Sequence, residues 1–274
     1  MKSHHFSRLA GKSAVVCLAL GAVLLFLLAF TARAAAGRER MVGRAIDAHA
    51  RTLENHVVRA KYPSKPIALH DDDGTILAFP PRASAAVPPS KPLTVVYLHG
   101  IHGRAENGCP WLREGASEIG WLVCPAANEH LANGTFSWAG SVADQRAVVA
   151  RAERAAQAQG ADDRGANVIV GFSQGAYVAL DLVRARLGSY RGLVLIGANV
   201  EPSSAVLAAG GVRRIVLAAG ELDASFAPLQ RAAERLHREG VDVRFVDLGR
   251  IGHSYETTDK DALRDAIVWA GRSS

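Results

Sequence analysis

Residues 167–183 read NVIVGFSQGAYVALDLV, an apolar run that passes through a glycine-flanked serine into a helical pattern. The run at its start is continuous and β-branched, as in a strand that is covered on both faces. After the serine, apolar residues recur at helical spacing. The stretch therefore predicts a sharp strand-to-helix turn over 171–175 with Ser173 at its tip.

The same alternation of strand and helix extends to both sides of this stretch. Continuous apolar strands that alternate with helices indicate a mostly parallel sheet with helices on both faces, an α/β fold. Further strands are predicted at 93–100, 121–125, 192–198, 214–220 and 241–248, and helices at 144–159, 175–187, 226–240 and 256–272. Two short strands at 67–69 and 75–79, joined by a turn at 72–74, precede a loop at 80–92.

Ser173 lies in a G-x-S-x-G motif whose lead-in strand and following helix suit a nucleophilic serine. The alternative is an ordinary turn with a capping serine. A serine hydroxyl needs a base, and His253 follows the last predicted strand in a Gly-x-x-Gly-His loop. A carboxylate should orient that histidine, and both Glu221 and Asp223 follow the preceding strand. We favour Asp223, because its place in the loop better suits a side chain that reaches His253.

Two backbone amides are needed to stabilise an oxyanion. Gln174 follows the serine, and Ile101 lies in the loop after strand 93–100. In the same region, His102 and the aromatic residues Phe136 and Trp138 are candidates for lining a substrate pocket. The alternative for the aromatic pair is a loop that a buried tryptophan anchors to the core.

Four landmarks together, LHGI at 98–101, GFSQGA at 171–176, GELD at 220–223 and IGH at 251–253, resemble the α/β-hydrolase superfamily. Within it, GFSQGA resembles the carboxylesterase, acyl-protein thioesterase and dienelactone-hydrolase-like branches. The resemblance covers about residues 93–272. It implies the α/β-hydrolase fold, with Ser173, Asp223 and His253 as the triad and the amides of Ile101 and Gln174 as oxyanion donors.

The resemblance also implies metal-independent hydrolysis of an ester or thioester through an acyl-enzyme, without a cofactor. The chain departs from it at 128–140 (NEHLANGTFSWAG), which fits no single branch, and in its N-terminus, because the cytosolic thioesterases lack an export signal. Peptidase or acyltransferase chemistry on the same residues, and a non-catalytic envelope binding protein, are the alternatives. No HExxH or paired-cysteine metal motif and no glycine-rich phosphate loop occurs in the sequence.

Residues 1–34 combine three early basic residues, an apolar run at 14–30 and small residues at 32–34, which predicts a signal peptide or a signal anchor. We expect an exported protein, with a membrane partner only if this segment is uncleaved. Residues 35–92 are expected to form a helical linker (helix 38–60) and the first strands, and 93–274 the catalytic core.

The formal net charge of +6 arises mainly in that N-terminal segment. Without its four basic residues, 28 Lys and Arg face 26 Asp and Glu, so no nucleic-acid partner is predicted. The resemblance implies a small-molecule or acyl substrate instead. Cys109 and Cys124 remain after signal removal, either as a disulfide or as two buried thiols. The sequence predicts no oligomeric state.

Overall fold

The computed structural model describes residues 66–71, 74–82, 92–162, 167–257 and 259–272. The predicted signal segment 1–34 and helix 38–60 lie outside these residues, as do positions 83–91 of the predicted loop. Within the described ranges, no helix combines the length and the apolar character that crossing a membrane requires.

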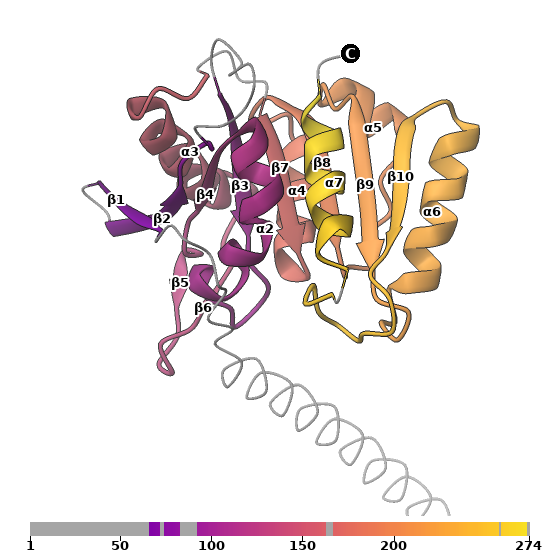
Figure 1. Cartoon of the computed structure of the whole chain (residues 1–274), viewed down its shortest axis with the longest axis horizontal. Coiled ribbons are helices and arrows are strands. Elements are labelled where there is room, and N and C mark those ends of the chain that lie inside the picture. The colour runs from indigo at the N-terminus through magenta and orange to yellow at the C-terminus, as the bar shows by residue number, and fades with distance from the viewer. Residues whose placement is uncertain (1–65, 72–73, 83–91, 163–166, 258, 273–274) are drawn as a thin grey trace, which may run out of the picture. The chain divides into compact units, whose positions relative to one another are not determined.

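The main sheet contains eight strands in the order β1-β2-β4-β3-β7-β8-β9-β10 (Figure 1). All neighbours from β4 to β10 run parallel, whereas β2 pairs antiparallel with both β1 and β4. The strands are β1 (Ile67–Asp71), β2 (Gly74–Phe79), β3 (Leu93–Leu98), β4 (Gly120–Cys124), β7 (Asn167–Phe172), β8 (Tyr190–Ile196), β9 (Arg214–Ala219) and β10 (Asp242–Asp247). The predicted mostly parallel sheet is confirmed.

Helices cover both faces of this sheet because side chains alternate along each central strand. In β3, Val95 and Tyr97 join the core beneath one helical layer, while Val96 and Leu98 join the core beneath the other. The first layer holds α2 (Ala105–Ile119) and α7 (Lys260–Gly271), seen in front of the sheet in Figure 1. The second holds α3 (Val142–Ala158), α4 (Gln174–Arg184), α5 (Ser204–Ala209) and α6 (Phe226–Arg238).

Besides α2, for which no range was predicted, three short elements had no counterpart among the predicted segments. Strands β5 (Glu129–His130) and β6 (Phe136–Ser137) pair as a small antiparallel hairpin, and α5 has six residues. Elements this short present too few positions for a periodic pattern to emerge. The hairpin lies within residues 128–140, the segment that fits no single branch of the resembled superfamily.

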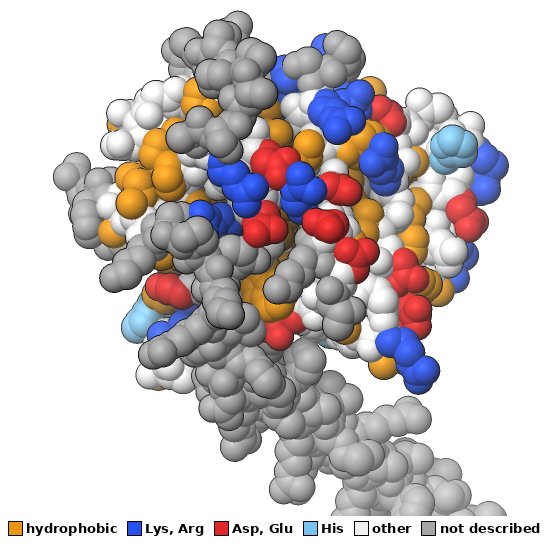
Figure 2. Space-filling model, in the orientation of Figure 1, with side chains coloured by type: hydrophobic (Ala, Val, Ile, Leu, Met, Phe, Trp, Pro, Cys, Tyr) orange, Lys and Arg blue, Asp and Glu red, His pale blue; other side chains and the backbone are white. Residues whose placement is uncertain are grey.

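Charges of both signs interleave on the face that Figure 2 shows, over α2 and α7. Arg264 of α7 pairs with Glu118 of α2, and Arg82 also reaches Glu118 at 3.7 Å. Opposite charges so placed pair with one another, and the described residues form no basic stripe on this face.

A disulfide joins Cys109 of α2 to Cys124, the last residue of β4. The Cα atoms lie 6.1 Å apart, a separation ordinary for such bonds, and both side chains are fully buried. The link therefore fixes α2 to the sheet directly after the loop that follows β3.

Reduction of this disulfide is expected to lower the free energy of unfolding by about 3 kcal/mol, because the unfolded chain regains the freedom that a loop of this size removes. Urea unfolding with and without reductant measures the change. The variant Cys109→Ala/Cys124→Ala serves as the control, since reductant should leave its midpoint unchanged. Equal midpoints for the wild type in both conditions would contradict the prediction.

Candidate active site

Ser173 lies at the turn between β7 and α4, with a φ of 52° that side-chain-bearing residues rarely adopt. Two glycines make this turn possible. A Cβ on Gly171 would lie 2.3 Å from the carbonyl oxygen of Gly175, and one on Gly175 would lie 2.2 Å from that of Leu98. The turn therefore holds the serine side chain out at the carboxyl edge of the sheet, as the motif predicted.

His253 and Asp223 complete a hydrogen-bonded row with Ser173. Nε2 of His253 lies 2.9 Å from Oγ of Ser173, and its Nδ1 lies 2.7 Å from Oδ2 of Asp223. The histidine follows β10 and the aspartate follows β9, so three strand ends supply the three groups. Glu221 is exposed, and only its backbone amide is engaged nearby, donating to Gly249. The structure thus brings Asp223 rather than Glu221 to His253.

Asp223 is held ionised beside the imidazole. Its other oxygen, Oδ1, accepts hydrogen bonds from the amide and the hydroxyl of Ser225, at 2.8 and 2.9 Å. Burial opposes ionisation, but the hydrogen bonds from His253 and Ser225 outweigh it, so the pKa of Asp223 lies below its ordinary value. An ionised carboxylate can only accept, which assigns the proton of the imidazole to Nδ1. Nε2 is then free to accept the hydroxyl proton of Ser173.

The loop after β3 lies against the serine. A Cβ on Gly100 would lie 3.2 Å from Cβ of Ser173, and Ile101, with its side chain 53% exposed, follows directly. Gln174 is the first residue of α4, so its amide has no acceptor within the helix. The two predicted oxyanion donors therefore lie in segments that meet at Ser173.

The β5–β6 hairpin fastens these two segments together. The side-chain amide of Gln174 pairs with the backbone of Trp138, accepting from its N–H at 3.0 Å and donating to its carbonyl at 2.9 Å. Gly103 and Phe136 exchange backbone hydrogen bonds, and the amide of His102 donates to Oγ of Ser137. The loop after β3 and the start of α4 are thereby tied to one hairpin.

The aromatic candidates of this hairpin take different places. Trp138 is buried, and its indole N–H donates to the carbonyl oxygen of His99 at 3.0 Å. This placement matches a loop anchored to the core, the alternative reading of the sequence, because the indole lies beneath the loop rather than at the surface. The side chain of His102 is exposed, on a residue with a φ of 54°.

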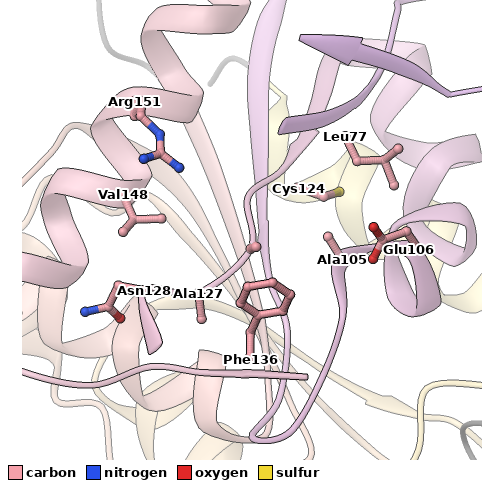
Figure 3. A pocket seen from close by; sticks show the side chains of 10 residues that line it. Leu77, Ala105, Glu106, Cys124, Ala127, Asn128, Phe136, Val148 and Arg151 are labelled. Carbon is pink, nitrogen blue, oxygen red and sulfur yellow. The ribbon is translucent and has the colours of Figure 1, made fainter. Parts of the chain in front are cut away.

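Phe136 lines a cavity of about 520 Å³ over the end of β4 (Figure 3). Apolar side chains from four other elements, including Leu77, Ala105 and Val148, share the lining with the polar residues Glu106 and Arg151. Neither Ser173, Asp223 nor His253 is among its lining residues. Phe136 therefore faces a space that the triad residues do not line.

His99, in the loop after β3, is buried with both ring nitrogens engaged. Its Nε2 accepts from the amide of Ala127 at 3.1 Å, so the neutral ring carries its proton on Nδ1, which donates to the carbonyl of Gly100 at 2.8 Å. Burial lowers the pKa of His99. The neutral ring thus bridges the loop after β3 to the segment after β4.

Because the folded protein holds His99 neutral, we predict that its free energy of unfolding decreases as the pH is lowered. Because its pKa is lowered in the folded state, the unfolded chain binds more protons as the pH falls through about 6.5, and folding loses free energy there. The urea midpoint of the wild type should drop between about pH 7.5 and about pH 5, and by less in His99→Asn. The matched control His237→Asn changes an exposed residue of α6, so its urea midpoint should drop as much as that of the wild type. An identical drop in all three proteins would contradict the prediction.

Known proteins resemble this chain in structure only. No protein-family model and no curated protein sequence matches it. Among solved structures, the fluorophosphonate-binding serine hydrolase FphF of Staphylococcus aureus is similar at 16% identity with a TM-score of 0.53, over 76% of this chain and 98% of that one. A Pyrobaculum calidifontis esterase is 17% identical with a TM-score of 0.53, over 85% and 91%. A Bacillus cereus carboxylesterase is 18% identical with a TM-score of 0.52, over 71% and 93%.

The chain has the α/β-hydrolase fold. In this fold the strand-to-helix turn at Ser173 occupies the position of the nucleophile elbow, and Asp223 and His253 follow in the order that the fold uses. No cluster of three or more His, Cys, Asp or Glu side chains that could hold a metal ion occurs in the described part of the chain.

Proposed function

We propose that this chain is a serine hydrolase that cleaves a carboxylic ester or thioester through an acyl-enzyme. The observation that carries the proposal is the row from Ser173 through His253 to Asp223, with hydrogen-bond distances of 2.9 and 2.7 Å. A serine hydroxyl becomes a nucleophile when a base accepts its proton, and this row supplies the base and the carboxylate that orients it.

The roles of the residues follow from their hydrogen bonds. Oγ of Ser173 attacks the carbonyl carbon while its proton passes to Nε2 of His253, and the ionised Asp223 stabilises the imidazolium. The amides of Ile101 and Gln174 stabilise the oxyanion. His253 then gives its proton to the leaving group, which departs as an alcohol or a thiol. Attack of water, with His253 again accepting a proton, releases the acid and regenerates Ser173.

Covalent labelling tests the nucleophile. A fluorophosphonate probe should react with the folded protein, and mass spectrometry should place the adduct on the peptide that contains Ser173. In parallel, p-nitrophenyl esters of graded acyl length should be hydrolysed, and the length profile would size the acyl site. A folded protein that is neither labelled nor active would refute the proposal and favour a binding protein with this fold. Labelling without ester hydrolysis would favour a peptidase or acyltransferase.

The export of the protein remains a proposal that rests on residues 1–34. N-terminal sequencing of the protein recovered from the producing cell distinguishes its two forms. A new N-terminus near Ala34 would indicate a cleaved signal peptide, whereas the intact N-terminus in the membrane fraction would indicate an anchor. An intact chain recovered from the cytosol would contradict export.

A further inference from the structure

A groove of about 660 Å³ lies between α6 and the loop that joins β8 to α5. Three arginines of α6 line it, Arg231, Arg235 and Arg238, and Glu201 is the only acidic residue in its lining. Positions four and three residues apart fall on one face of a helix. The three guanidinium groups therefore line one wall of the groove, spaced over about 10 Å of helix.

One of these arginines forms a hydrogen bond that joins the two walls of the groove. Arg235 donates to the carbonyl oxygen of Pro202 at 2.8 Å and pairs with Glu239 at 3.3 Å. It thereby fastens α6 to the opposite loop. Arg231 and Arg238 are exposed and make no ion pair with another described residue. The guanidinium groups of Arg231 and Arg238 are thus available to a ligand.

The end of a helix attracts basic residues for a reason unrelated to ligands. Arg235, His237 and Arg238 in the last turn of α6 complement the negative end of its dipole. The dipole explains neither Arg231, which lies about one turn before the last turn, nor the common face of the three arginines. His237 does not line the groove. The face that meets the β8–α5 loop is therefore the part of α6 on which arginines gather.

One end of the groove is close in sequence to residues that contact the candidate active site. A Cβ on Gly197 would lie 3.4 Å from Cε1 of His253 and 3.3 Å from Oδ2 of Asp223. Asn199, which lines the groove, follows two residues later, and two residues of chain span at most about 7 Å. Asn199 thus marks the end of the groove that is nearer to the triad, and α6 carries the arginines away from it toward the start of β10. A substrate held at Ser173 reaches these arginines only if it extends along this loop.

We infer that this groove binds the anionic part of the substrate, a carboxylate or phosphate group remote from the bond that is cleaved. The inference rests on the proposed function. Planar guanidinium groups bind such oxyanions through paired hydrogen bonds, and the groove carries two that are available, those of Arg231 and Arg238, against one carboxylate in its lining, Glu201. The substrate class is thus an ester or thioester with a second, negatively charged end.

Matched esters test this inference. For p-nitrophenyl monoesters of dicarboxylic acids of increasing length, kcat/KM should exceed that for the neutral acyl esters of equal length, with a maximum at one length. In Arg231→Gln/Arg238→Gln, the ratio of anionic to neutral kcat/KM at that length should fall about tenfold or more, because hydrogen bonds to charged groups are lost. Arg213→Gln, which removes an exposed arginine outside the groove, should keep the wild-type ratio.

Binding to an inactive protein gives a second readout. Suberate, the dicarboxylate of eight carbons, should bind Ser173→Ala in calorimetry, more weakly as salt increases, and at least about tenfold more weakly when the two arginines are also replaced. The inference would be overturned if the ratio of anionic to neutral kcat/KM were the same in all variants. It would also be overturned if this ratio fell equally in Arg213→Gln. If the proposed function is wrong, no ester is hydrolysed. Calorimetry on Ser173→Ala then still tests whether the groove binds a dicarboxylate.

Discussion

Ser173→Ala is expected to lower kcat for a p-nitrophenyl ester by about a millionfold, to the residual rate that binding and oxyanion stabilisation alone sustain. The physical reason is that Oγ of Ser173 is the hydroxyl that lies within hydrogen-bond distance of Nε2 of His253. Without it, the imidazole has no nucleophile to activate. Steady-state hydrolysis under substrate saturation measures the effect.

The variant should fold as the wild type does, because alanine removes only the hydroxyl. Alanine must still adopt the φ of 52° at this turn, so thermal unfolding is the necessary control. A folded Ser173→Ala protein that retains more than about a hundredth of the activity would show that the measured hydrolysis does not use this serine.

Asp223→Asn is expected to lower kcat by about ten-thousandfold while the fold is preserved. An amide in place of Oδ2 can present its N–H₂ to Nδ1 of His253, which would then accept, leaving the proton on Nε2 where it faces Ser173. The histidine would hold the wrong tautomer for a base. The pH-independent maximum of kcat, taken from a full pH profile, reports the loss.

Glu221→Gln is the matched control, because it makes the same change two residues away on an exposed side chain. Its activity should remain near that of the wild type. If Glu221→Gln lost activity and Asp223→Asn did not, the assignment of the carboxylate would be reversed.

The arrangement around Ser173 could be predicted because it depends on local sequence. A β-branched run, two glycines and a helical pattern specify the turn at 171–175, and parallel strands bring their carboxyl ends to one edge. His253 and Asp223 could be placed because each directly follows a strand. The choice between Glu221 and Asp223 depended on the turn in which the amide of Asp223 donates to Gly220, a contact that spacing alone does not specify.

The contacts that support the site could not be predicted, because they join distant parts of the chain. The side chain of Gln174 pairs with Trp138, 36 residues away, and His99 accepts from Ala127, 28 residues away. Neither pairing leaves a periodic signal in one sequence. The groove lined by α6 was also unforeseen, since its opposite wall is a loop that follows a different strand.

Strand β10, at one edge of the described sheet, has a consequence for self-association. A free edge offers unpaired backbone groups to another chain, and charged side chains on it discourage such pairing. Asp242, Arg244 and Asp247 are exposed on β10, and Arg244 lies over the ring of Trp269, 4.3 Å from its centroid. The strand that brings the chain to His253 thus also carries charges that disfavour pairing of a second chain along this edge.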